Sequence, residues 1–498
     1  MEYISGTDRN QLFLFKETLN RSIDDNNYIR IIDSYVESLD LESLGFLLPS
    51  LKYGKPPYRP QLLLKIYIYG YMERIRSSRR LEKECARNME MIWLTESLNP
   101  DFKTISDFRM NNKKGIRNIF KEFLSFCNKA GLLSLETVAI DGTKLRAQNN
   151  LNNVYHKKEM EHIQKKIDEK IEAYLKELDD EDLKDGDSIK LDNTETNKNI
   201  VEKLGKLKKY KTKLNEVQKR FDENPEIDLF FSTDEDSRFQ SDKGKVRAGY
   251  NAQTAVDSKN KLIVVSEVTN ECNDLNQTIP IVTKLVELKK ELGIENKTEV
   301  LEDAGYFSEK SITEYKESDN IELYISDPKE SKKSLKDNSG IIPTKDYIID
   351  KFIYDKDKGI FICPMGKELH KTHTNPGKES SGREVFEYHC IDCFNCSEIK
   401  NCTNNKRGRS IKVSINKEYM DNFKEKMKTE GSINKIGKRK ELSEHPFGCI
   451  KHNMGYTYFM QRGFEKVKSE FSFICFTHNL KRAINILGFT NFMMLLNK

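Results

Sequence analysis

The segment Val138-Ala139-Ile140-Asp141-Gly142-Thr143 carries the pattern that most constrains the fold of this chain. An apolar run typical of a buried strand ends there in an aspartate at a glycine-containing turn. The segment Val300-Leu301-Glu302-Asp303-Ala304-Gly305-Tyr306 repeats this arrangement. A third carboxylate, Glu444, lies in the basic and apparently helical stretch Ser443-Glu444-His445-Pro446-Phe447-Gly448-Cys449-Ile450-Lys451. Carboxylates supplied by two strands and a helix are suited to holding divalent metal ions against phosphate.

The segments around these acids predict a mixed sheet covered by helices. We expect a first strand at 137–141, a hairpin formed by 247–256 and 262–269, a helix near 279–292, and strands at 299–302 and 321–325. The first strand and the strand at 299–302 should be neighbours. Their ends would then place Asp141 and Asp303 side by side.

Two regions next to the predicted strands have sequence patterns typical of helices. Residues 40–112 predict compact helices joined by tight turns, with arginines that include Arg79 and Arg80. This composition is compatible with a DNA-binding module, and an ordinary helical domain fits it equally well. Residues 154–223 are rich in Lys and Glu and predict a helical hairpin that interrupts the catalytic unit.

The predicted organisation therefore has five parts. We expect a helical DNA-binding domain at 1–130 and a catalytic core made of 131–150 and 246–328. A charged helical insertion would occupy 151–245, and a Cys-rich, basic insertion 329–435. The remaining residues, 436–498, would hold the helix of Glu444 and a C-terminal helix.

The composition limits the classes of protein to which this chain can belong. A chain of 498 residues is too long for one core, and with 33% charged and 37% hydrophobic residues it has the makeup of a globular protein. It has no apolar run long enough to span a membrane, and no signal peptide begins it, so we expect a cytoplasmic protein.

Thirteen Lys and Arg against six acids in 406–451 give that segment a charge of about +7. This charge suits a polyanionic partner, although a solvated surface would show the same excess.

The combined motifs resemble the DDE transposases of bacterial insertion sequences. The resemblance rests on Asp141-Gly142-Thr143, on Gly249-Tyr250-Asn251 followed by Gln253, on Asp303-Ala304-Gly305-Tyr306, and on Glu444-His445-Pro446-Phe447-Gly448 with Lys451. It implies an RNase H-like catalytic fold in which Asp141, Asp303 and Glu444 are the catalytic triad and hold Mg²⁺, as two ions. It also implies double-stranded DNA as substrate, both terminal inverted repeats and target DNA, and a homodimer when two ends are brought together.

A Tyr-Arg-Glu-Lys signature of related transposases is only partly kept. Lys451 stands at the expected spacing after Glu444, but the Arg position holds Lys440, with Arg439 beside it, and the Tyr position holds Gly437. We expect Arg439, Lys440 and Lys451 to contact DNA phosphates, together with Arg79 and Arg80. Lys451 should lie two helical turns from Glu444 on the same face. Pro446 would restrict where that helix starts.

Other acids near these motifs have simpler interpretations. Asp257 should fall in the hairpin turn and Asp274 just before a helix, so turn and capping roles suit them better. Glu302 precedes Asp303 in a strand and should therefore point to the opposite face, where a structural role is expected.

Five of the ten cysteines lie between residues 363 and 402, and the last four follow a C-x2-C-x2-C-x5-C pattern. In a reducing compartment such spacing favours a structural Zn²⁺ site, with Cys363, Cys390, Cys393 and Cys402 as ligands and Cys396 as a spare. Free thiols that bind no metal are the alternative.

The function indicated is cleavage of element ends and transfer of the freed 3′-hydroxyl to target DNA. Two alternatives remain open: a metal-dependent nuclease of the same fold that does not join strands, and a DNA-binding protein whose catalytic site has degenerated.

Overall fold

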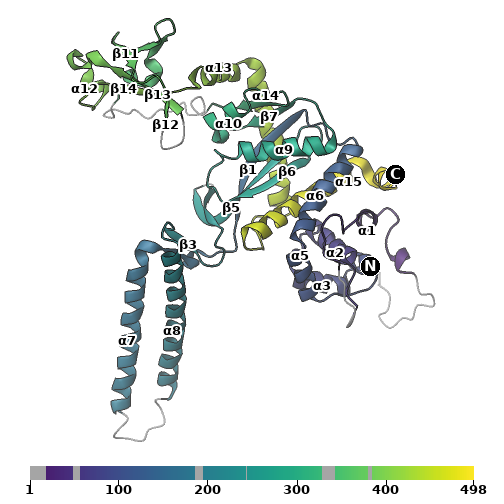
Figure 1. Cartoon of the computed structure of the whole chain (residues 1–498). Coiled ribbons are helices and arrows are strands. Elements are labelled where there is room, and N and C mark those ends of the chain that lie inside the picture. Colours follow the sequence, from purple (N-terminus) through teal and green to yellow (C-terminus); the bar gives the residue numbers. More distant parts are fainter. Residues whose placement is uncertain are drawn as a thin grey trace, which may run out of the picture. The chain divides into compact units, whose positions relative to one another are not determined.

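The computed structural model describes residues 18–48, 56–184, 194–242, 244–327, 343–378 and 384–497. It is a mixed α/β protein with a mixed sheet and an N-terminal helical region, as expected for an RNase H-like fold (Figure 1). The chain forms two compact units. Unit 1 contains Met1–Ser134, Gly142–Asn273 and Glu444–Lys498, and unit 2 contains Leu135–Asp141 and Asp274–Ser443. Within the described ranges, no helix has the length and apolar character needed to cross a membrane.

The N-terminal part of unit 1 is helical. After the 3-10 turn η1 (Leu19–Ser22) come α1 (Ile29–Glu37), α2 (Pro60–Met72), α3 (Ser78–Arg87), α4 (Met89–Leu94), α5 (Phe102–Asn111) and α6 (Lys113–Lys129). Local interactions determine where several of these helices begin. Pro60 occupies the first turn of α2, where no backbone N–H is needed. The side chain of Asn88 caps α4, and that of Asp101 caps α5 by accepting from the N–H groups of Lys103 and Thr104.

The long C-terminal helix α15 (Phe464–Leu496) organises the core of unit 1. It is interrupted at Gly488, whose φ of +70° only glycine adopts readily. Its Phe476 meets Phe123 of α6 edge to face at 5.3 Å, and Tyr35 of α1 meets Phe123 in the same way at 5.5 Å. The N-terminal helices are thereby built around α15.

The charged insertion forms the expected helical hairpin. Helices α7 (Met160–Lys184) and α8 (Thr194–Glu223) lie side by side (Figure 1), and the short strands β2 (Val154–His156) and β3 (Leu229–Phe231) pair antiparallel at its base. The short 3-10 turns η2 (Leu151–Asn153) and η3 (Lys157–Glu159) precede α7. A separate apolar core, which includes Met160, Leu214 and Phe221, holds the hairpin together. Residues 185–193 of this insertion lie outside the described residues.

The main sheet is built on β1 (Thr137–Arg146), which belongs to both units. In unit 2 its first half pairs parallel with β7 (Thr298–Glu302), and β7 pairs parallel with β8 (Ile321–Ile325). In unit 1, β5 (Lys245–Asp257) pairs antiparallel with β4 (Arg238–Asp242) and with β6 (Ile263–Thr269). The strand order is β4-β5-β1-β7-β8, so the expected neighbourhood of β1 and β7 is confirmed.

Unit 2 also contains the helices that follow these strands and a second, small sheet. The helices are α9 (Thr278–Leu292), α10 (Glu309–Glu314), α12 (Ile399–Cys402), α13 (Lys417–Met427) and the part of α14 (Glu430–Gly448) that precedes Glu444. The 3-10 turns are η5 (Ala304–Tyr306), η6 (Lys345–Tyr347), η7 (Ile349–Lys351) and η8 (Ile391–Asn395). The small sheet has the order β12-β13-β11-β10-β9, and β14 pairs with β13. Its strands are β9 (Ile353–Asp355), β10 (Ile360–Ile362), β11 (Glu368–Lys371), β12 (Gly377–Lys378), β13 (Glu384–Cys390) and β14 (Ser410–Ser414).

The expectation about Pro446 was wrong. Pro446 does not mark the start of its helix but lies inside the last turn of α14. Proline removes one helical hydrogen bond and crowds the preceding turn. The helix continues after it as the π-helical turn η9 (Cys449–Asn453), a wider winding that often accompanies such irregularities.

Gly249 permits the close approach of β5 to β1. A Cβ atom at this position would lie 2.5 Å from the carbonyl oxygen of Leu145, a backbone atom that cannot move aside without shifting the strand. We expect Gly249→Ala to lower the free energy of unfolding by about 1–3 kcal/mol, measured by urea denaturation. The control is Gly205→Ala in α8, where nothing lies within 4 Å of the added Cβ and helix propensity favours alanine by up to about 1 kcal/mol. Equal stability of the two variants would contradict the close-packing argument.

Candidate active site and nucleic-acid interface

The register of β1 and β7 aligns the two aspartates. Ala139 pairs with Leu301, and two residues further along each chain stand Asp141 and Asp303. Both strands run in the same direction, so the two acids lie at equivalent positions on neighbouring strands. The three residues before Asp141 are fully buried, which anchors this end of β1 in the sheet. The predicted pairing of the two strands is therefore confirmed, and the adjacency of the aspartates follows when this register is extended by two residues.

Asp303 also shapes the turn that follows β7. Its Oδ1 accepts a hydrogen bond of 2.8 Å from the backbone N–H of Gly305. A Cβ atom on Gly305 would lie 3.0 Å from that oxygen and 3.7 Å from Oδ2 of Asp274. The turn thus brings Asp274 beside Asp303. Sequence reasoning assigned Asp274 to a turn, and its carbonyl does accept from the N–H of Gln277, but the position of its carboxylate was missed.

A buried tyrosine lies among these acids. Burial raises the pKa of Tyr306 well above its usual value, and the carboxylates of Asp274, Asp141, Glu302 and Asp303 raise it further. Tyr306 is fully buried, so its hydroxyl stays protonated. Three aspartates and Glu302 therefore lie around one neutral side chain near the ends of β1 and β7.

Glu302 differs from the other acids in its protonation. It is completely buried, and burial raises the pKa of its carboxyl to about 8, with a further contribution from Asp303. The hydroxyl of Thr278 in α9 donates to it at 2.9 Å, which moderates the shift. A neutral, buried carboxyl adds no negative charge beside Asp303, and this agrees with the structural role expected for Glu302.

Helix α14 supplies a cation to Asp141. Nη1 of Arg439 lies 3.2 Å from Oδ2 of Asp141, and the two side chains are only 15% and 20% exposed. The sequence predicted that Arg439 contacts a DNA phosphate, whereas in the structure it forms an ion pair with a candidate catalytic acid.

Lys440 and Glu444, further along α14, are both exposed. Glu444 is the residue at which the chain passes from unit 2 into unit 1.

Lys451 lies in the π-helical turn η9. The wider turn changes the angular step per residue, so the strict α-helical spacing expected between Glu444 and Lys451 does not hold. The signal for this was Pro446, whose placement within the helix was not foreseen.

Lys451 instead lines a groove within unit 1 that is strongly basic. The groove has a volume of about 430 Å³, and its charged lining consists of one acid, Asp242, and six basic residues: Lys144, Arg146, Lys245, Arg247, Lys451 and His452. They come from β1, β4, β5 and η9. A charge distribution of this kind favours a polyanion. Sequence analysis found Lys451 but missed the other residues, because their charges gather only when β1 and β5 pair.

A second groove of about 640 Å³ adjoins the first through Arg146, Arg247 and Ala248. It is lined by Gln148, Asn149, Asn150 and Tyr458. The guanidinium of Arg146 lies 5.7 Å from the ring centre of Tyr458, and that of Arg76 lies 4.6 Å from it. An aromatic ring with cations and amides around it is a surface on which a nucleic-acid base can stack.

The N-terminal arginines lie on exposed positions. Arg79 and Arg80 lie in the first turn of α3, and the guanidinium of Arg79 is 4.8 Å from the ring centre of Phe102. Their predicted contact with DNA stays a prediction.

No group of three or more His, Cys, Asp or Glu side chains in the described part of the chain is already arranged as a metal site. The donors at the strand ends nevertheless fit Mg²⁺ in type, because they are carboxylate oxygens and Mg²⁺ keeps several waters. The cysteines predicted to bind zinc lie together in the small sheet, where all five line one cavity.

Comparison with known families agrees with this geometry. Residues 362–484 match a family described as a transposase DDE domain, and residues 17–111 match one described as a transposase domain. Each match covers a minority of the chain, and both support a DDE transposase of the insertion-sequence type. The first match includes Glu444 and Lys451 and the second includes Arg79 and Arg80, while Asp141 and Asp303 lie outside both ranges. No curated protein matches the chain.

The protonation of Glu302 predicts how the stability of the protein depends on pH. Its folded-state pKa, about 8, lies above the ordinary glutamate value of 4.5, so the folded state binds more protons between these values. The stabilisation is full below pH 4.5 and is lost as pH rises through 8, by up to about 1.4 kcal/mol per pH unit. We expect Glu302→Gln, which stays neutral, to remove this part of the decline in chemical denaturation between pH 5 and 8. Parallel curves for variant and parent would contradict a protonated Glu302.

Proposed function

We propose that the chain cleaves the ends of an insertion sequence and joins the freed 3′-hydroxyl to target DNA, with Asp141, Asp303 and Glu444 as catalytic carboxylates. The observation that most supports this is the parallel register that aligns Asp141 with Asp303. Glu444 lies within the residues that match the transposase DDE domain. Cleavage and joining are both displacements at phosphorus by an oxygen nucleophile, so one carboxylate site serves both steps.

The three carboxylates would hold Mg²⁺, as two ions in the working complex. When bound, Mg²⁺ would lower the pKa of an attacking water or hydroxyl and stabilise the leaving oxygen. The protein's own contribution would be to hold Asp141 and Asp303 in place. Arg439 does this for Asp141 by its ion pair, and the N–H of Gly305 does it for Asp303. Neutral Glu302 behind them limits the repulsion between neighbouring acids.

Arg439 also connects the acids to DNA binding in this proposal. Its guanidinium neutralises Asp141 in the structure, and a metal ion would take over that neutralisation. Arg439 would then be available to a phosphate oxygen, the contact expected from the sequence. Lys440, exposed one residue later on α14, would contact the same backbone.

The basic groove of unit 1 would carry the DNA backbone. Its six basic residues neutralise phosphates, and the adjoining amides and Tyr458 provide contacts to bases. Arg79 and Arg80 would add contacts from the N-terminal helices. Because joining requires two element ends, we include a homodimer in the proposal.

The catalytic assignment is tested by Asp141→Asn and Asp303→Asn. Each removes a metal-binding charge while keeping side-chain volume, and we expect a loss of Mg²⁺-dependent cleavage of at least about 10²-fold. Cleavage of a labelled duplex containing the element end is the measurement. The control is Asp421→Asn, since the side chain of Asp421 in α13 is about half exposed and forms ion pairs with Lys417 and Lys424 of the same helix. Retained cleavage in the Asp141 variant would refute the proposal.

The same variants separate the alternatives. With pre-cut ends as substrate, a transposase yields joined product, whereas a nuclease of this fold yields none. A degenerate DNA-binding protein would bind the ends and show neither reaction.

The role of the groove is tested through the salt dependence of DNA binding. We expect Arg247→Ala to weaken binding and to reduce the slope of log K against log salt by about 0.9, the release of one counterion. Fluorescence anisotropy with a labelled duplex over a series of KCl concentrations measures this. Arg220→Ala on the exposed face of α8 is the matched control, which should leave the slope unchanged. An unchanged slope for Arg247→Ala would exclude this groove as a phosphate track.

A further inference from the structure

The small sheet of unit 2 contains a cluster of thiols that the proposed DNA chemistry does not use. Cys363, Cys390, Cys393, Cys396 and Cys402 all line one enclosed cavity of about 20 Å³. They reach it from different elements, since Cys363 follows β10, Cys390 ends β13, Cys393 lies in η8, and Cys402 ends α12. A cavity of this size, surrounded by sulfur, is suited to a single ion.

We propose that Cys363, Cys390, Cys393 and Cys402 bind one structural Zn²⁺ ion in this cavity, and that Cys396 is not a ligand. The thiols are not yet arranged as a metal site.

Backbone amides already point at the sulfurs. The N–H of Lys367 donates to Sγ of Cys363 at 3.3 Å, and the N–H of Arg409 donates to Sγ of Cys393 at 3.4 Å. The turn after Cys363 is closed by a 2.8 Å bond from the N–H of Gly366 to the carbonyl of Cys363. Gly366 has a φ of +72°, which favours glycine there. Such N–H···S bonds stabilise thiolates, the form in which cysteine binds metal.

The contacts of the cysteines indicate which of them act as ligands. Cys363 and Cys393 each have a backbone amide directed at the sulfur. Cys390 and Cys393 belong to the buried core of the small sheet, and Cys363 packs against it. Four sulfurs complete a tetrahedral site, so one of the five thiols lies outside it, and the spacing of the cysteines assigns that place to Cys396.

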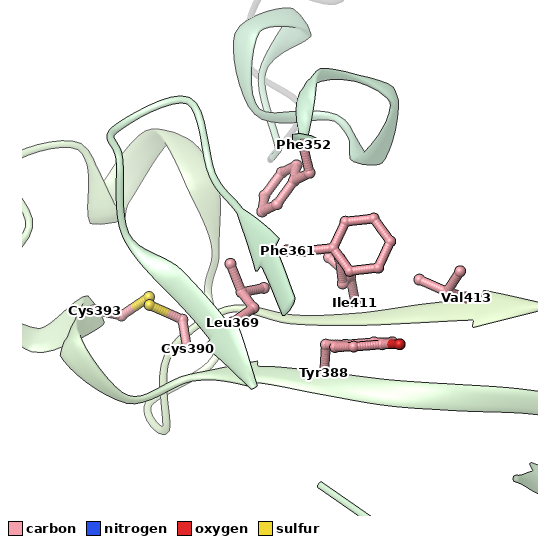
Figure 2. Close-up of a cluster of buried hydrophobic side chains, with 8 residues drawn as sticks. All are labelled: Phe352, Phe361, Leu369, Tyr388, Cys390, Cys393, Ile411 and Val413. Atoms are coloured by element: carbon pink, nitrogen blue, oxygen red, sulfur yellow. The ribbon is translucent and has the colours of Figure 1, made fainter. Parts of the chain in front are cut away.

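The size of the small sheet supplies the physical reason for such a site. Its apolar core consists of eight buried residues, two of which are Cys390 and Cys393 (Figure 2). Figure 2 shows their sulfurs directed toward each other beside Leu369. A core this small contributes little stability by burial alone, and small folds often gain the rest from a metal.

The experiment measures zinc in the full-length chain, purified in the presence of a reductant. We expect about one Zn²⁺ per chain by elemental analysis. Replacement by Co²⁺ should give the thiolate-to-cobalt absorption and the visible bands of a tetrahedral four-sulfur site. Single Ser variants of the four proposed ligands should lose most of the bound zinc, and Cys396→Ser and Cys272→Ser should keep it.

Several outcomes would overturn the proposal. A reduced wild-type chain that binds no Zn²⁺ or Co²⁺ when either is added would exclude the site. A cobalt spectrum without tetrahedral sulfur features would exclude it as well. Loss of zinc in Cys396→Ser with retention in Cys402→Ser would refute the ligand set. Asp141→Asn should keep its zinc, so failure of the zinc proposal and failure of the proposed function are distinguishable.

Discussion

Parallel pairing between β1 and β7 is the constraint on which the candidate active site depends. Hydrogen bonding between adjacent parallel strands fixes which residues stand opposite each other, and a slip of one residue would turn Asp303 to the other face of the sheet. The register from Thr137 with Glu299 to Ala139 with Leu301 leads directly to the two aspartates. Complete burial of Val138, Ala139, Ile140, Val300 and Leu301 makes any slip costly. The apolar runs of the sequence thus determine where the acids lie.

Charge compensation around these acids is distributed over several elements. Asp141 has the guanidinium of Arg439 from α14, and Asp303 has the amide of Gly305. Glu302 is instead neutralised by protonation, because complete burial makes its ionised form unfavourable. Glu302 and Asp303, which are adjacent in the chain, are therefore stabilised in different ways. This difference lets a buried strand end in a carboxylate site without accumulating uncompensated charge.

The sequence predicted most of the elements because their signals are local. The apolar runs at 137–141 and 299–302, the hairpin formed by 247–256 and 262–269, and the helix near 279–292 each depend on residues close together in the chain. Pro446 shows where local rules fail. Proline is disfavoured inside a helix, yet α14 extends through it, and the π-helical turn η9 follows it. Because the helix continues into η9, Lys451 lies at a different angular position from the one that α-helical spacing predicts.

What the sequence determined by itself was the set of acids on strands and helix, the transposase family and the thiol pattern, because residue type and spacing encode these. Only the tertiary structure decided which groups meet. The approach of Asp274 to Asp303, the Arg439–Asp141 ion pair, the basic groove formed by β1 and β5, and the gathering of five thiols around one cavity all join residues far apart in the chain. The physical reason is that such contacts follow from the packing of whole elements, which no short segment specifies.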